Sequence, residues 1–188
     1  YVIDASGRDT LLAGQFQSKA RNPKHNSAAV FGHFRNAQRL EGEKAEGNIS
    51  IFWFEHGWIW FIPLADGTTS VGATCWPSYL KTRDKPLDAF FFDTLALAPA
   101  LMERLRDATL EGGRVHATGN YSYSARQASG TRWLMLGDAF AFVDPVFSSG
   151  VYLAMASAYA ALPLVHKTLD DGPAAAAAER RRYEAHMR

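Results

Sequence analysis

The segment WLMLGDAFAFVDPVFSSGVYLAM, residues 133–155, joins an apolar run, a loop and the start of a long helix. The run lies within TRWLMLGDA (131–139) and ends in Gly137 and Asp138. A continuous apolar run of this kind is typical of a parallel strand that delivers a loop to a site. A carboxylate at the end of such a strand can accept hydrogen bonds from the hydroxyl groups of a ligand.

The second half of the segment predicts a helix start near that strand end. An apolar, Ala-rich helix is expected from about Ser149 to Asp170, with Ser148 and Gly150 at its beginning. The first turn of a helix has unpaired N–H groups, which can hold an anion, and a glycine there lets a ligand approach the backbone. Taken singly, each residue is explained as well by local structure: Asp138 as the cap of a turn, Ser148 or Ser149 as the cap of the helix, and Gly150 as a packing glycine. Their combination is more specific.

The rest of the chain predicts an α+β fold. Four runs alternate as strands: SAAVFGHF (27–34), NISIFWF (48–54), GWIWFIPL (57–64) and TTSVGATCW (68–76). Short Gly-containing turns separate the last three, so we expect an antiparallel meander. Residues 85–109 have helical spacing, and Pro99 divides them into two helices.

Three further segments lead to more local expectations. YVID (1–4) predicts a buried strand, GRVHATGNYSYSARQ (113–127) predicts a single alternating strand, and Gly172-Pro173 predicts the start of a last helix. Tyr123 and Arg126 are candidates to line a pocket, and a surface-facing strand explains them at least as well.

Composition bounds the function. The 188 residues are 47% hydrophobic and 21% charged with a net charge of +1, which indicates a globular chain without a nucleic-acid partner. A single cysteine, Cys75, excludes an internal disulfide and fits a cytoplasmic location. The longest apolar stretch, 151–165, is too short for a membrane span. No histidine pair has metal-ligand spacing and the serines lack a GxSxG context, so neither a metal site nor a serine hydrolase is expected.

GDAFAFVDPVFSSGV (137–151) resembles the second FAD-binding signature of the glutathione-reductase-like flavoprotein monooxygenases, and VIDASGR (2–8) resembles their turn near the cofactor phosphates. The resemblance implies an antiparallel substrate-side sheet at 17–127, and the C-terminal portion of an FAD domain at 1–16 and 128–188. It also implies a set of FAD-binding residues: Asp4, Gly7, Arg8, Gly137, Asp138, Pro145, Ser148, Ser149, Gly150 and Val151.

Within that superfamily, GWIWFIP is similar to the GWxWxIP signature of flavin-dependent halogenases. This similarity implies a halide site at Ser149 and Gly150, and a pocket formed by Trp58, Trp60, Ile62, Pro63 and Phe147. Trp58 and Trp60 share one strand face, where two rigid rings can exclude water, although plain core packing also explains them. Phe147 aligns with a glutamate of the tryptophan halogenases, which favours the branch acting on phenols and pyrroles.

The implied function is an FAD-dependent halogenase acting on an electron-rich aromatic, free or tethered to a carrier protein. It would use O2, halide and reduced FAD supplied by a separate flavin reductase. The GxGxxG fingerprint and the essential lysine of the family are expected upstream of Tyr1, so this segment is expected to hold no catalytic residue and to be inactive alone. An aromatic hydroxylase, a geranylgeranyl-reductase-like flavoprotein and a non-catalytic binding remnant remain alternatives.

Overall fold

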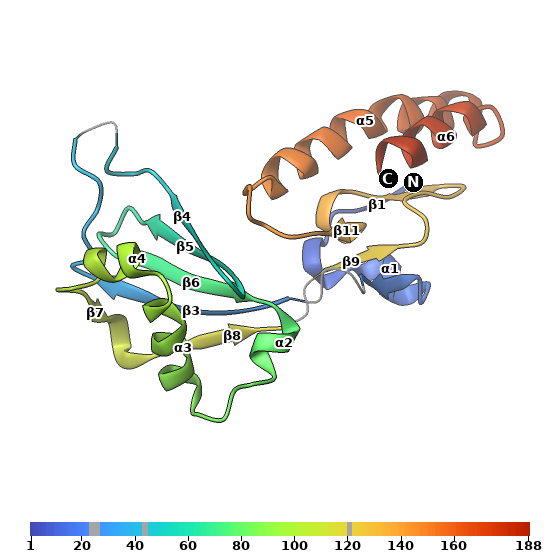
Figure 1. Cartoon of the computed structure of the whole chain (residues 1–188). Coiled ribbons are helices and arrows are strands. Elements are labelled where there is room, and N and C mark those ends of the chain that lie inside the picture. The colour runs from blue at the N-terminus through green and yellow to red at the C-terminus, as the bar shows by residue number, and fades with distance from the viewer. Residues whose placement is uncertain (23–26, 43–44, 120–121) are drawn as a thin grey trace. The chain divides into compact units, whose positions relative to one another are not determined.

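The computed structural model describes residues 1–22, 27–42, 45–119 and 122–188, and it confirms a mixed helix and sheet fold (Figure 1). The chain divides into two compact units. Unit 1 comprises Tyr1–His25 and Ser122–Arg188, and unit 2 comprises Asn26–Tyr121. Each unit has its own hydrophobic core.

Unit 2 is an antiparallel sheet covered on one face by helices (Figure 1). The strand order is β4-β5-β6-β3-β7, and β8 also pairs with β3. The strands are β3 (Ala28–Arg35), β4 (Ser50–Phe54), β5 (Gly57–Pro63), β6 (Thr69–Cys75), β7 (Thr109–Leu110) and β8 (His116–Thr118). The helices are α2 (Pro77–Leu80), α3 (Leu87–Ala96), α4 (Pro99–Arg104) and the 3-10 turn η2 (Glu111–Gly113). The predicted meander and the division of the helices at Pro99 are both confirmed.

The two faces of the unit 2 sheet differ. Ile59 and Phe61 of β5 pack with Phe91 and other residues of α3 and α4 in the core. Trp58 and Trp60 alternate with them and so lie on the opposite face, with ring centroids 5.9 Å apart.

Trp60 lies across its neighbouring strand. A Cβ atom built at Gly72 of β6 would lie 2.2 Å from Cζ2 of Trp60 and 2.5 Å from Cβ of Phe31, so only glycine leaves room for the indole. The Trp60 indole N–H donates to Oγ of Ser70 at 3.1 Å. Packing and this hydrogen bond therefore fix the orientation of the Trp60 ring.

Unit 1 contains a parallel strand pair, a small antiparallel sheet and two long helices. β1 (Val2–Asp4) pairs in parallel with β10 (Trp133–Met135), so the expected parallel strand before the Gly-Asp pair is confirmed. The antiparallel sheet has the order β11-β9-β2, from β2 (Lys19–Arg21), β9 (Tyr123–Ala125) and β11 (Ala141–Phe142). The helical elements are η1 (Gly7–Asp9), α1 (Leu11–Gln15), η3 (Gly137–Ala139), α5 (Gly150–Asp171) and α6 (Ala177–His186).

Two sequence-based expectations for the ends of the chain were wrong. Val2 and Ile3 of β1 are 53% and 49% exposed, because β1 has one strand neighbour and no covering layer among the described residues. The last helix begins at Ala177 and not at Gly172-Pro173, because residues 173–176 form turns first.

The expectation of one strand over 113–127 was also wrong. β8 pairs with β3 in unit 2, whereas β9 pairs with β2 and β11 in unit 1, and positions 120–121 between them lie outside the described residues. Alternation of side chains is the same in one strand as in two, so the pattern could not show the break. Because of this pairing, residues 17–22 and 122–127 lie in unit 1 and not with the larger sheet.

Within the described residues, no helix has both the length and the apolar character that crossing a membrane requires.

Candidate functional site

A groove of about 430 Å³ in unit 1 brings three distant segments together. The turn after β1, the turn after β10 and the first turn of α5 form it, through Ala5, Gly7, Leu136, Asp138, Gly150, Val151 and Ala154. Four of these lining residues, Gly7, Asp138, Gly150 and Val151, belong to the cofactor site predicted from the sequence. Most of the lining side chains are small, so a ligand can lie close to the backbone.

The turn after β1 is held by Asp4. The buried Asp4 carboxylate accepts the backbone N–H groups of Ser6 at 2.9 Å and Leu12 at 2.7 Å. Burial raises the pKa of Asp4, but the hydrogen bonds from Ser6 and Leu12 outweigh it, so the net pKa lies below the ordinary value. Asp4 itself does not line the groove. Its visible effect is to shape the turn that presents Gly7, whose φ of +62° is left-handed.

The turn after β10 is fixed through its backbone. Gly137 has a φ of +46°, and its N–H donates to Oγ of Ser157 on α5 at 2.9 Å. A Cβ atom at Gly137 would lie 3.0 Å from both Cα and Cβ of Ala154, so the turn and the helix are in close contact. The Tyr123 hydroxyl donates to the carbonyl oxygen of Asp138 at 2.8 Å. These bonds orient the turn without using the Asp138 carboxylate.

The carboxylate of Asp138 is the available acceptor of the groove. Its side chain is half-buried, and among the described residues no donor hydrogen-bonds to it. Burial raises the pKa of Asp138 above the ordinary value, and the nearby Arg8 guanidinium opposes that shift. A ligand hydroxyl can therefore supply the hydrogen bond that the protein does not.

The third side of the groove is the start of α5. The Ser148 N–H donates to the Pro145 carbonyl at 2.8 Å, and Ser148 has a left-handed φ of +51°. The first bond of the helix runs from the N–H of Leu153 to the carbonyl of Ser149 at 2.9 Å. The N–H groups of Gly150 and Val151 precede it and have no helical acceptor, which is the usual arrangement at a helix N-terminus. The helix therefore presents backbone donors at the groove.

The other predicted residues lie outside the groove. Arg8 stacks over the Phe142 ring, with its guanidinium carbon 5.6 Å from the ring centroid. Pro145, Ser148 and Ser149 shape the start of α5 without lining the groove, and Phe147 is 87% exposed. The remaining pocket residues, Trp58, Trp60, Ile62 and Pro63, belong to unit 2.

The sequence analysis missed Ala5, Leu136 and Ala154 as lining residues, and Ser157 as a support. A usable signal existed for two of them. Ala154 and Ser157 follow Gly150 by four and seven residues, a spacing that places all three on one helix face. Across 1–22, 27–42, 45–119 and 122–188, no cluster of three or more His, Cys, Asp or Glu side chains could hold a metal ion.

Comparison with known proteins identifies the family. A sequence model described as tryptophan halogenase matches residues 1–188. The flavin-dependent halogenase ptaM of Pestalotiopsis fici is 37% identical over 170 residues, which cover 86% of this chain and 31% of that protein. The 1H-pyrrole-2-carbonyl-(peptidyl-carrier protein) chlorinase of Pseudomonas fluorescens is 30% identical over 165 residues, covering 84% of this chain and 36% of that protein.

Solved structures agree with the sequence comparison. The crystal structure of CmlS, a flavin-dependent halogenase, has a TM-score of 0.83 at 31% identity and covers 98% of this chain and 34% of that one. The chain spans about a third of the length of the curated relatives it matches. The match along all 188 residues shows that the chain belongs to the tryptophan halogenase family of flavin-dependent oxidoreductases, whose cofactor is FAD.

Proposed function

We propose that this chain forms the flavin loop and the substrate-side sheet of a halogenase that acts on an electron-rich aromatic, a phenol or a pyrrole. The observation that carries the proposal is the groove in which Gly7, Asp138 and Gly150 converge from three segments. Bound and reduced FAD would supply the redox chemistry, activating O2 so that a halide can be oxidised. The residues of this chain would hold the cofactor, hold the halide and exclude water.

The groove suits a long polyhydroxylated cofactor. The Asp138 carboxylate, which has no donor among the described residues, would accept hydrogen bonds from the ribityl hydroxyls of FAD. Gly7 and Gly150 have open space where a Cβ atom would stand, so the cofactor could contact their backbone. Arg8 carries the positive charge for the phosphate end that the family resemblance assigns to this turn.

The start of α5 is the proposed halide site. The N–H groups of the first turn, beginning at Gly150 after the Ser149 N-cap position, have no helical acceptor. The positive end of the helix dipole favours an anion at this point. Ser149 forms no side-chain cap that would compete for these donors.

The aromatic face of unit 2 is the proposed wall of the substrate pocket. The Trp60 ring is fixed over Gly72 and by its hydrogen bond to Ser70, and Trp58 lies beside it. The two rigid indole rings, with Ile62 on the same strand face and Pro63 at the end of the strand, would exclude water without rearranging during the reaction.

Two findings support a phenol or pyrrole as the substrate, free or tethered to a carrier protein. Phe147 stands where the tryptophan halogenases that the sequence resembles carry a glutamate. One of the relatives is a chlorinase of a pyrrole bound to a peptidyl-carrier protein. The same proposal includes a separate flavin reductase as partner, a lysine beyond this segment as the catalytic residue, and a cytoplasmic location.

The test uses the full-length protein with FAD, a reductase, O2 and either chloride or bromide. Phenols and pyrroles, free and carrier-tethered, are offered, and products are identified by mass spectrometry. We expect a halogenated product that disappears when halide is omitted. A hydroxylated product that forms equally without halide would identify a hydroxylase. Reduction of a geranylgeranyl substrate, offered in a parallel assay, would identify a reductase. Bound FAD without any product would identify a binding remnant.

A further inference from the structure

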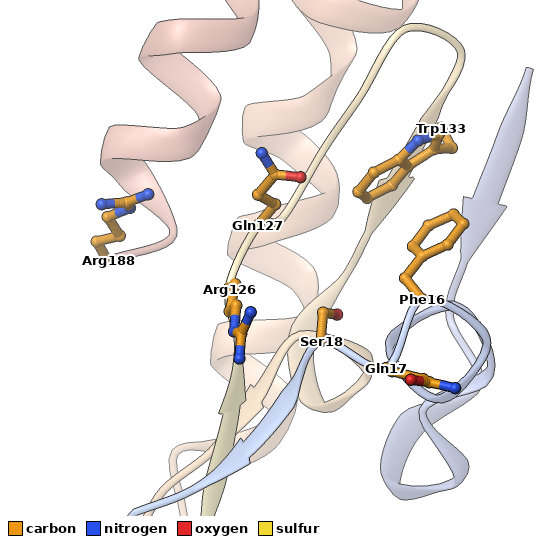
Figure 2. Close-up of a pocket in the computed structure, with 7 residues that line it drawn as sticks. All are labelled: Phe16, Gln17, Ser18, Arg126, Gln127, Trp133 and Arg188. Atoms are coloured by element: carbon orange, nitrogen blue, oxygen red, sulfur yellow. The ribbon is translucent and has the colours of Figure 1, made fainter.

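A second pocket of about 570 Å³ lies in unit 1, away from the groove of Gly7, Asp138 and Gly150 that is proposed for FAD, here called the flavin groove. Its lining, drawn in Figure 2, consists of Phe16, Gln17, Ser18, Arg126, Gln127, Trp133 and Arg188. Trp133 is the first residue of β10, whereas the flavin groove begins at Leu136, just beyond the last residue of that strand. The two cavities share no lining residue and lie at opposite ends of the same strand.

The pocket has an aromatic side and a cationic side. Figure 2 shows Phe16 and Trp133 together at one side, and Arg188 and Gln127 toward the other. The Phe16 and Trp133 rings have centroids 4.8 Å apart at an interplanar angle of 47°. Phe16 is 45% exposed, so its ring is accessible to a ligand.

None of the side chains that line the pocket is a carboxylate. Among the described residues, none forms an ion pair or a side-chain hydrogen bond with the Arg126 guanidinium. Arg188 approaches Glu184, with Nη2 and Oε2 3.9 Å apart, and Glu184 does not line the pocket. The side-chain amides of Gln17 and Gln127 add neutral donors. A guanidinium with no partner presents a planar fork that matches a carboxylate.

The backbone around the pocket is held in place before any ligand binds. Gln17 adopts a left-handed φ of +49°, and its N–H donates to the carbonyl of Gly14 at 3.0 Å. The N–H of Ser18 donates to the carbonyl of Ala13 at 2.9 Å, and the N–H of Arg126 donates to the carbonyl of Ser18 at 3.1 Å. The segments that carry the aromatic and the cationic side chains are thereby tied to each other, which lowers the ordering cost of binding.

We propose that this pocket is a second ligand site, for a small planar aromatic carboxylate. The carboxylate pairs with Arg126, assisted by Arg188, and the ring of the ligand contacts Phe16 and Trp133. The aromatic side selects for a flat apolar group, and the unpaired guanidinium selects for the anion.

The test uses the full-length protein labelled with 5-fluorotryptophan and saturated with FAD, so that the flavin groove is filled. The fluorine resonance of Trp133 is assigned by its loss in Trp133→Phe. Benzoate is the probe, and benzamide is the uncharged control of nearly the same shape. We expect a saturable shift of the Trp133 resonance with a dissociation constant on the order of 1 mM. Benzamide should bind about tenfold more weakly.

Variants locate the binding site. Arg126→Gln should weaken benzoate binding about tenfold, because it replaces the charged fork with a shorter, uncharged amide. Arg182→Gln is the matched control, since Arg182 is exposed on α6 outside the pocket and should not affect binding. Equal binding of benzamide and benzoate, or unchanged binding in Arg126→Gln, would overturn the proposal. A negative result here would not bear on the proposed halogenase function, because the halogenation test measures products formed at the flavin groove.

Discussion

Asp4 is the last residue of β1, Asp138 lies in the turn after the neighbouring parallel strand β10, and the two carboxylates have opposite environments. The Asp4 carboxylate accepts two backbone N–H groups and has a lowered pKa. The Asp138 carboxylate has no donor among the described residues, faces a groove and has a raised pKa. The same side chain thus stabilises a turn in one place and is available to a ligand in the other.

Replacing the ligand-facing carboxylate tests its role. Asp138→Asn keeps the shape of the side chain but removes its charge, so a hydroxyl donor loses a charge-assisted bond. We expect FAD affinity to fall about tenfold, measured by titration of flavin fluorescence. Asp170→Asn, at an exposed position near the end of α5, is the matched control and should bind FAD normally. Equal affinities in the two variants would contradict the assignment.

The raised pKa of Asp138 predicts a pH dependence of FAD binding. Only the ionised carboxylate accepts the ribityl hydroxyls fully, so affinity is complete above its pKa and declines as the pH falls through it. Because burial, the largest cause, raises this pKa, the decline should begin above the usual aspartate value of about 3.9. Titrations at several pH values should show this decline in the native protein, and Asp138→Asn should lack it. The pKa of Asp4 is lowered, so its ionised carboxylate should stabilise the fold down to a pH below the usual aspartate pKa. This stabilisation is lost as the pH falls through the lowered pKa.

Gly137 tests how closely the turn after β10 contacts α5. In Gly137→Ala, the new Cβ atom would lie 3.0 Å from Ala154 at a φ of +46°, so we expect a loss of about 1–3 kcal/mol in the free energy of unfolding. Chemical denaturation measures the loss. Gly14→Ala in α1 has ordinary φ and open space, and should be neutral or slightly stabilising. An unchanged free energy of unfolding in Gly137→Ala would show that the added Cβ atom causes no strain at the contact with Ala154.

At the scale of elements, α6 supports β10, which pairs with β1 on one edge and is bridged from Leu134 to Ser129 on the other. The buried Tyr183 hydroxyl donates to the carbonyl of Met135, two residues before Gly137, at 2.5 Å. One carboxylate oxygen of Glu184 accepts the N–H groups of Ala128 at 2.9 Å and Ser129 at 2.6 Å. The helix therefore holds both β10 and the turn before it in place.

Removing the Tyr183 hydroxyl should loosen this support. Tyr183→Phe leaves a buried carbonyl without its donor. We expect the free energy of unfolding, measured by urea denaturation, to fall by about 1–3 kcal/mol. FAD affinity should fall as well, because β10 leads directly into the turn that carries Asp138. Tyr159→Phe is the control, since Tyr159 is exposed on α5 and its loss of a hydroxyl should change neither quantity. Equal effects in both variants would show that α6 does not position the strand.

At the scale of the molecule, the groove proposed for FAD belongs to unit 1, while the two tryptophans belong to the separately packed unit 2. FAD should protect the backbone amides of three distant segments together: 5–7, 137–138 and 150–152. Hydrogen exchange with mass spectrometry measures this protection, and at a hundredfold excess over Kd the binding adds about 2.7 kcal/mol to stability. Asp138→Asn should need more FAD for the same protection. Protection of only one segment would show that they do not share a site.

The sequence by itself determined many of the elements, and it determined the family. Turn glycines set the meander, Pro99 divided the helices because it ends helical hydrogen bonding, and the Gly-Asp pair and Ser-Ser-Gly marked the groove. These are local signals, carried by neighbouring residues.

Only the tertiary structure decided which segments pair and which carboxylate is available. β8 and β9 share one alternating pattern yet pair in different sheets, and Asp4 and Asp138 have the same side chain yet different hydrogen-bond partners. The pocket beside Trp133 likewise combines the segment after α1, the segment after β9 and Arg188. Pairing, burial and hydrogen-bond supply depend on residues far away in sequence, so no local pattern contains them.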